Sequence, residues 1–303
     1  MLFVDSDVNI IPQKPGLKGA LQNAEYAGRT CYNSYDKMTD ESYNEFIEML
    51  KRRGHTSPLE FATIYLEAPE DGDVDRFWRS RTEDDDRKKF VRIKHAESVA
   101  YITTNYNELL YWNRLDDLQY LVDEPSVYHY VRMMVKWCPI ARGIADEFAR
   151  HRSFSHCIQS TRYCNYTRAD KFGSDIRFVL PTKAYRLRDS LVNTFDPLGR
   201  DRKYLTHLKG DVLSSNLAAI DRGFNVYRNQ IYSIEKSYNE LITCGWKPQE
   251  ARGILGFDVM TEHCMCGFIS DWDRFLKIRT AVGAHPDAID LANKLKKKIE
   301  DNG

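Results

Sequence analysis

Long apolar runs are absent from this sequence. None of its hydrophobic segments approaches the roughly 18 residues that indicate a membrane helix. Residues 1–12 have neither the basic start nor the apolar centre of a signal peptide. An excess of one charge is also missing, since 44 Lys and Arg residues balance 44 Asp and Glu residues. These absences predict a cytoplasmic protein that binds neither membranes nor, through a broadly basic surface, nucleic acids.

Several familiar binding motifs are absent as well. Neither G-x-G-x-x-G nor G-x-x-x-x-G-K-[ST] occurs, so the sequence supports neither a Rossmann dinucleotide fold nor a P-loop. The seven cysteines are odd in number and scattered, which is unlike a disulfide framework and suits a reducing compartment. His263-Cys264-Met265-Cys266 lacks the second cysteine pair of a structural zinc site. We therefore expect no metal site, and buried thiols on a strand at Cys264 and Cys266.

Apolar periodicity is present over most of the chain and predicts both helices and strands. One helix, over residues 39–53, has Gly54 at its left-handed exit, while residues 69–94 are so charged that a solvated helix or loop is expected. Because the sequence shows no repeat and no linker, it predicts an α/β (α+β) fold in one domain, a mixed sheet with flanking helices. The other predicted helices cover 108–121, 127–137, 139–148, 225–241, 248–255, 275–278 and 286–299, and the predicted strands cover 59–68, 99–104 and 176–180.

The segment from Arg150 to Tyr163 is the most informative part of the chain. It contains three arginines, two histidines and four Ser or Thr hydroxyls in a protein whose formal net charge is zero. Guanidinium groups match phosphate oxygens two at a time, and hydroxyls with loop N–H groups complete such a site. A solvated basic turn would explain any single arginine here. The set as a whole predicts a binding site for a nucleotide phosphate.

The same segment, read as R-H-R-x-x-S-x-x-x-x-S-x-R-Y, resembles the signature of the ThyX family, the flavin-dependent thymidylate synthases. Two other segments, 270–272 and 284–286, resemble a longer-chain branch of that family. The resemblance implies a single ThyX-like domain over residues 1–303, in which inserts around 69–135 and 183–243 exceed the compact core of the family. The further similar segments are 27–32, 55–60, Ala251-Arg252, Thr261, 270–272, 275–279 and 284–286.

The resemblance also implies a reaction, the reductive methylation of dUMP to dTMP. Methylenetetrahydrofolate is then the carbon donor, and FAD reduced by NADPH is the hydride source. The implied assembly is a homotetramer whose subunits share each site. Arg279 matches the catalytic position that stabilises negative charge on the pyrimidine. The positions matching the dUMP site are Glu147, Arg150, Gln159, Ser160, Thr161, Arg162, Arg252 and Arg279, and those matching the FAD site are Ser57, Arg150, His151, Arg152, Ile158, Phe268, Ser270 and Arg274.

Three of these positions depart from the family pattern. Ile158 stands where the longer branch carries a polar residue, while Phe268 and Ser270 replace an Asn and an Arg of compact members. Two alternatives are open: a flavin- and folate-dependent methylase or hydroxymethylase of another pyrimidine nucleotide such as UMP, or a non-catalytic nucleotide-binding module. Cys157 lies inside the arginine-rich segment, where it is either a nucleophile or a packed thiol. We expect packing, because the flavin route requires no thiol.

Overall fold

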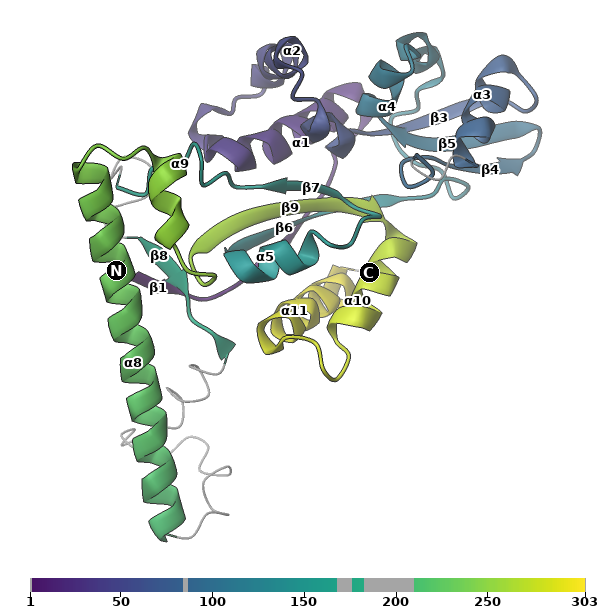
Figure 1. The fold of residues 1–303 in the computed structure, drawn as a ribbon. Coiled ribbons are helices and arrows are strands. Elements are labelled where there is room, and N and C mark those ends of the chain that lie inside the picture. Colours follow the sequence, from purple (N-terminus) through teal and green to yellow (C-terminus); the bar gives the residue numbers. More distant parts are fainter. Residues whose placement is uncertain (1, 84–86, 168–175, 183–209, 303) are drawn as a thin grey trace.

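A four-stranded antiparallel sheet lies at the centre of the structure (Figure 1). The computed structural model describes residues 2–83, 87–167, 176–182 and 210–302, except for the side chains of 210–221 and 302. The strands in spatial order are β2 (Val8–Ile11), β6 (Arg132–Ala141), β9 (Met260–Phe268) and β7 (Ser155–Ile158). Successive side chains of a strand point to opposite faces, so Met265 of β9 belongs to one core and Cys264 and Cys266 belong to another.

Helices cover both faces of this sheet. α5 (Arg142–Phe148), α10 (Ile269–Arg279) and α11 (Pro286–Asn302) lie on one face, and α1 (Gly16–Tyr32) lies on the other (Figure 1). Under the sheet, the Phe148 ring packs edge-on against Phe275 with centroids 4.9 Å apart, and against Trp137 at the same distance. This aromatic packing brings the C-terminal ends of α5 and α10 together.

A second antiparallel sheet, of three strands, lies at one end of the first (Figure 1). Its strands are β3 (Thr63–Pro69), β5 (Val99–Asn105) and β4 (Arg92–Ala96), with β5 in the middle. The surrounding elements are α2 (Ser42–Arg53), α3 (Asp73–Thr82), α4 (Tyr106–Tyr111) and the 3₁₀ turns η2 (Ser57–Phe61) and η3 (Leu115–Tyr120), whereas the turn η1 (Tyr35–Lys37) contacts the central sheet through Tyr35. Leu50, Ile64, Trp78 and Ile102 share the core of the second sheet. Most of this unit falls in the range 69–135.

A third group of elements packs around the parallel strands β1 (Leu2–Val4) and β8 (Arg177–Val179). The long helix α8 (Gly210–Thr243), the short helix α9 (Pro248–Ala251) and the turn η5 (Arg252–Ile254) complete it. Phe178, Ile231 and Tyr238 belong to its core. Residues 183–209, in the second expected insert, lie outside the described residues. None of the helices within the described ranges is both long and apolar enough to cross a bilayer.

Much of the sequence-based prediction is confirmed. The chain combines helices and strands, as the α/β fold class requires. α2 ends at Gly54, which adopts the left-handed conformation at φ 68°. The strand predicted at 59–68 begins later, at Thr63, because residues 57–61 form a 3₁₀ turn, and it ends at Pro69 as expected. The predicted thiols Cys264 and Cys266 are buried on a strand.

The helix predicted over 127–137 is wrong, because most of this segment is the strand β6. Val135 pairs with Met265 on one side, and Trp137 pairs with Val8 on the other. A central strand of this kind is held by its neighbours, and such tertiary pairing overrides a local helical spacing. Just before β6, Ser126 donates its backbone N–H to His129 Nδ1 within a turn, at 3.1 Å.

Two boundaries and one burial pattern also differ from expectation. The helix predicted from residue 139 begins at Arg142, because β6 continues to Ala141. The helix predicted over 108–121 stops at Tyr111, followed by Asn113 with φ at 54° and a separate 3₁₀ turn. The charged range 69–94 is not simply solvated, since the side chain of Trp78 in α3 is fully buried. Charge on one helical face concealed the apolar face of this helix.

Candidate active site

The arginine-rich segment crosses from the helical face of the central sheet to its edge. After α5 ends at Phe148, the chain turns, buries Phe154 among the rings under the sheet, and enters the edge strand β7. Beyond β7, the Gln159 N–H donates to the Glu262 carbonyl oxygen at 2.8 Å, and the Ser160 N–H donates to the Cys31 carbonyl oxygen at 3.0 Å. The chain after β7 is therefore fixed to β9 and to α1, whereas Arg150 and Arg152 before it remain exposed.

The first group of site residues is built around Arg279, at the end of α10. Its Nη1 donates to Glu147 Oε2 at 2.8 Å, and its Nη2 donates to the Glu147 carbonyl oxygen at 2.7 Å. Its Nε donates to His151 Nε2 at 2.9 Å. Three N–H groups of one guanidinium are thus used, which leaves one N–H on each of Nη1 and Nη2. These contacts hold the Arg279 side chain in a single orientation between α5 and the arginine-rich segment.

His151 is neutral in this arrangement. Its Nε2 accepts a hydrogen bond from Arg279 and therefore bears no proton, so the ring proton resides on Nδ1. Burial, reinforced by the positive charges of Arg279 and Arg274, lowers the pKa of His151 to about 4. A neutral imidazole is the form that can keep accepting from the guanidinium at pH 7.

A chain of histidines continues behind His151. The His151 carbonyl oxygen can only accept, so His156 Nε2 carries the proton of their 3.0 Å hydrogen bond. His156 Nδ1 is then an acceptor, and His263 Nε2 donates to it at 3.0 Å. Burial lowers the pKa of both His156 and His263. These two rings are neutral and fix the backbone that follows Arg150.

The second group of site residues surrounds the turn at Ser160. The Arg162 backbone N–H donates to Ser160 Oγ at 3.2 Å. The Arg252 Nη1 donates to Thr161 Oγ1 at 3.1 Å, which brings η5 to this turn. Two hydroxyls, the guanidinium of Arg252 and the backbone of Arg162 therefore meet at this turn, and both arginine side chains are exposed. Gln159, just before them, is buried to 3% exposure.

Five arginines of the predicted site are exposed and lack carboxylate partners. Within the ranges that the structure describes, none of Arg150, Arg152, Arg162, Arg252 and Arg274 forms a salt bridge. Elsewhere buried or half-buried arginines are commonly paired with acids in this protein. Uncompensated guanidinium groups of this density suit an anionic ligand, and they fit the phosphates of a nucleotide or a dinucleotide cofactor.

The predicted flavin contacts on α10 and the preceding strand differ in accessibility. Phe268, the last residue of β9, is 1% exposed, whereas Ser270 is exposed. The Arg92 guanidinium lies 4.1 Å from the Phe268 ring centroid and donates from Nη1 to Ser270 Oγ. Ser270 stands at the position matched to an Arg in compact ThyX members. In this chain its hydroxyl accepts a hydrogen bond from Arg92, which belongs to the expected insert.

Ser57 and Ile158, two further predicted flavin contacts, lie on η2 and β7. Ser57 is exposed at the start of η2, which packs against β7, and Ile158 is half-buried at the end of β7. No hydrogen bond between described residues joins Ser57 to the other predicted flavin contacts. The structure thus brings Glu147, His151 and Arg279 together, and Ser160, Thr161, Arg162 and Arg252 together, but leaves Ser57 separate.

A buried ion pair beneath Ser160 was not predicted from the sequence. Lys136 Nζ lies 2.9 Å from Glu262 Oε2, with both side chains 11% exposed. The Tyr35 hydroxyl donates to the same Glu262 oxygen at 2.9 Å. This pair could have been found, because β6 and β9 are largely apolar strands, with Lys136 in the interior of β6 and Glu262 as the one carboxylate of β9. The described residues contain no cluster suited to hold a metal ion.

Comparison with known proteins gives a family for this arrangement. A search of curated proteins found no match. The family model Thy1, described as thymidylate synthase complementing protein, matches residues 87–302, more than two-thirds of the chain. The match includes the arginine-rich segment and Arg279, whereas the similar segments 27–32 and 55–60 precede it. The chain therefore belongs to the Thy1 family, the flavin-dependent thymidylate synthases.

Proposed function

We propose that this protein converts dUMP to dTMP, with methylenetetrahydrofolate and NADPH as co-substrates and FAD as cofactor. The observation that supports this most directly is the set of five exposed arginines around the arginine-rich segment that form no salt bridge with a described residue, in a member of this family. When bound, the reduced flavin supplies a hydride and the folate supplies the one-carbon unit. The residues of the chain bind and orient the nucleotide and the cofactor, and they polarise the pyrimidine.

The turn at Ser160 is proposed to hold the phosphate of dUMP. Arg162 and Arg252 present guanidinium groups there, and Ser160 and Thr161 present hydroxyls. Arg150 lies at the other end of the segment, where it is proposed to contact both the nucleotide and the flavin. Bidentate contacts from planar guanidinium groups fix the orientation of a phosphate as well as its position. Gln159 is buried beside this turn and is proposed to line the nucleotide site.

Arg279 is proposed as the catalytic residue. Its two N–H groups that are not used by Glu147 or His151 are available to the O2/N3 edge of a pyrimidine. A guanidinium that is already oriented stabilises charge growing on the ring without further reorganisation. Glu147 acts in this proposal by holding Arg279, through its carboxylate and its backbone carbonyl. Glu147 is therefore proposed to belong to the dUMP site because it orients Arg279.

The flavin is proposed to lie against His151 and Arg152, with Ser57, Ile158, Phe268, Ser270 and Arg274 around it. Neutral His151 offers a polar edge without a second positive charge beside Arg279. Arg152 and Arg274 have unpaired guanidinium groups that suit the phosphates of FAD. The chain thus offers both a polar face for a flavin ring and cations for its phosphates.

A protein thiol has no part in the proposed reaction. Cys157 is buried, and its hydrogen bond with Cys31 and its burial raise the pKa of the Cys157 thiol well above the ordinary value. A protonated, inaccessible thiol is a poor nucleophile. Packing is therefore the proposed role of Cys157.

The working enzyme is proposed to be a cytoplasmic homotetramer of one ThyX-like domain per chain, with its inserts around 69–135 and 183–243. Exposed apolar side chains support such an assembly, because Phe257 and Val282 are 76% and 105% exposed and lie near Arg252 and Arg279 in the sequence. Sites shared between subunits would explain why so many guanidinium groups of a single chain remain unpaired.

The test of the proposal is flavin binding by the purified protein. We expect a yellow protein, or one that acquires an oxidised-flavin spectrum when FAD is added, and a spectrum that bleaches with NADPH. Arg152→Ala should weaken FAD binding, whereas Lys277→Ala, on the exposed side of α10, should not. A colourless wild-type protein that fails to bind added FAD would contradict the proposed function.

A further inference from the structure

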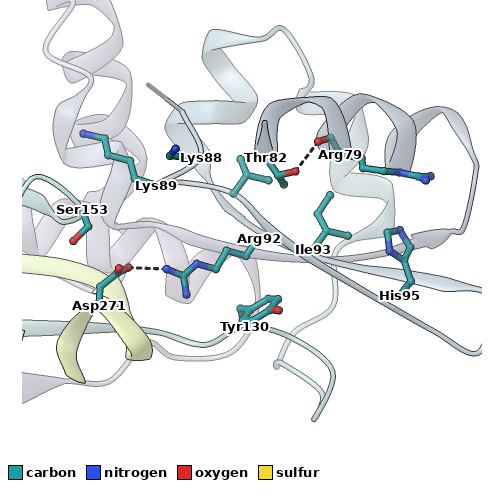
Figure 2. A pocket seen from close by; sticks show the side chains of 11 residues that line it. Arg79, Thr82, Lys88, Lys89, Arg92, Ile93, His95, Tyr130, Ser153 and Asp271 are labelled. Atoms are coloured by element: carbon teal, nitrogen blue, oxygen red, sulfur yellow. Dashed lines mark hydrogen bonds and ion pairs between the residues drawn. The ribbon is translucent and has the colours of Figure 1, made fainter. Parts of the chain in front are cut away.

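A cationic pocket opens between the second sheet and the arginine-rich segment (Figure 2). Its volume is about 590 Å³, within the range of small-molecule sites. Residues of the segment after α3 and of β4 line one side, and Ser153 and Asp271 line the other. Ser153 directly follows Arg152, so the pocket adjoins the proposed flavin site. None of its residues from 79 to 95 was given a chemical role from the sequence.

Positive charge dominates the lining of this pocket. The cations are Arg79, Lys88, Lys89 and Arg92, and the lining contains one carboxylate, Asp271. Arg79 and the imidazole of His95, which also lines the pocket, both contact Asp75, which accepts from Arg79 at 2.6 Å and lies 2.9 Å from the His95 ring nitrogen. Arg92 lies at the end of the pocket where Asp271 and Ser153 line it (Figure 2).

Arg92 is fixed in a definite orientation at that end. Its guanidinium stacks over the Phe268 ring at 4.1 Å, and its Nη2 donates to Asp271 at 3.1 Å. Nη1 donates to Ser270 Oγ. Since a guanidinium has five N–H groups, three remain for a ligand, including the one on Nε. Figure 2 shows the Arg92 side chain reaching across the pocket to Asp271.

Lys89 lines the same pocket and forms no salt bridge with a described residue, and Figure 2 shows its ammonium end pointing away from Arg92. Its ammonium group lies over the Phe90 ring at 4.6 Å. It is also close enough to His156 to lower the pKa of that imidazole, although burial is the main cause. The charge of Lys89 therefore acts on His156 in β7 and on Glu60 in η2, two elements that pack against each other.

We propose that this pocket binds a phosphate group of a nucleotide cofactor, with Lys89 and Arg92 as its cations and Ser153 as a hydroxyl donor. This inference rests on the proposed function for the identity of the cofactor. Arg matches two phosphate oxygens, and Lys adds a point charge. The volume exceeds that of a single phosphate, so part of the attached nucleotide also fits. The phosphate comes either from the flavin dinucleotide or from NADPH, and the two sources are separable by experiment.

The direct test is calorimetric titration of flavin-free protein with inorganic pyrophosphate. Lys89→Met and Arg92→Gln should each weaken binding about tenfold, which corresponds to the loss of one charge-assisted contact. Lys94→Met is the matched control, because Lys94 is exposed on the same strand outside the pocket. Equal pyrophosphate affinities in all four proteins, or no binding by the wild type, would overturn the proposal.

Flavin titrations and steady-state kinetics identify the source of the phosphate. If it belongs to the flavin, both variants weaken FAD binding about tenfold and leave riboflavin binding unchanged. If it belongs to NADPH, FAD binding is unchanged and KM rises for NADPH; KM for NADH rises as well if the pocket holds the pyrophosphate, and is unchanged if it holds the 2′-phosphate. The proposal is also overturned if neither cofactor responds. A wild type that binds pyrophosphate through Lys89 and Arg92 but takes up no FAD would refute the proposed function and leave the phosphate site standing.

Discussion

Replacing Arg279 tests both the geometry of the site and the role proposed for it. Arg279 makes three hydrogen bonds, of which the one to the Glu147 carboxylate is charged on both sides. A hydrogen bond to a charged group contributes about 1.5–3 kcal/mol and a neutral one about 0.5–1.5 kcal/mol. Lysine can retain at most one of the three. Because the Glu147 side chain is 31% exposed and water can solvate it, we expect Arg279→Lys and Arg279→Ala to lower the free energy of unfolding by roughly 2–3 kcal/mol.

The same variants should separate charge from geometry. Arg279→Ala removes a positive charge that lowers the pKa of His151, so this pKa should rise above about 4, whereas Arg279→Lys should change it less. Both substitutions should reduce kcat on the order of 10²-fold at saturating substrates, since a lysine cannot reproduce two N–H groups in one plane.

The assays are urea unfolding of flavin-free protein, NMR titration of His151 and steady-state kinetics. Lys277→Ala, an exposed cation in the same turn of α10, is the control and should change the stability by less than about 0.5 kcal/mol. Each variant must first retain flavin and oligomeric state. An unchanged kcat in Arg279→Ala would refute the catalytic role, and an unchanged His151 pKa would refute the geometry of the contact.

Three other predictions concern substrate binding, the thiol and pH. Arg162→Ala should mainly raise KM for dUMP with little change in kcat, because a phosphate contact exists in the ground state and the transition state alike; a fall in kcat alone would contradict this. Cys157→Ala should retain measurable dTMP formation in a folded, flavin-bound protein, and complete loss of turnover there would support a thiol mechanism. Since the pKa of His151 is about 4 in the folded state against 6.5 ordinarily, the unfolded state binds more protons between these values, so the free energy of unfolding should fall as the pH drops from 6.5 to 4. His151→Gln should flatten this dependence in urea unfolding, and an equal slope would contradict it.

The sequence alone predicted those features of the structure that depend on residues close together in the chain. Gly54 ends its helix as predicted, because a left-handed exit is a local property of glycine. The arginine-rich segment was likewise recognisable, since its residue types and spacing lie in one continuous stretch of chain. The contacts of Arg279 with Glu147 and His151 were not predictable from spacing, because they depend on the packing of Phe148 against Phe275.

Long-range pairing explains what the sequence concealed. The segment 127–137 has helical spacing, yet it becomes a central strand because partners far away in the chain pair with both of its edges. Arg92 illustrates the same limit at the site. It was assigned to a solvated, charged stretch, and only the fold places its guanidinium on Phe268 and Ser270, more than 170 positions later.

Product analysis tests the central claim most directly. Protein loaded with FAD is incubated with methylenetetrahydrofolate, NADPH and either dUMP or UMP, and the nucleotides are separated and identified by mass. We predict dTMP from dUMP, formation that depends on both FAD and folate, and no methylated product from UMP. Methylation or hydroxymethylation of UMP with dUMP unchanged, or no product from either nucleotide with flavin bound and reducible, would contradict the account.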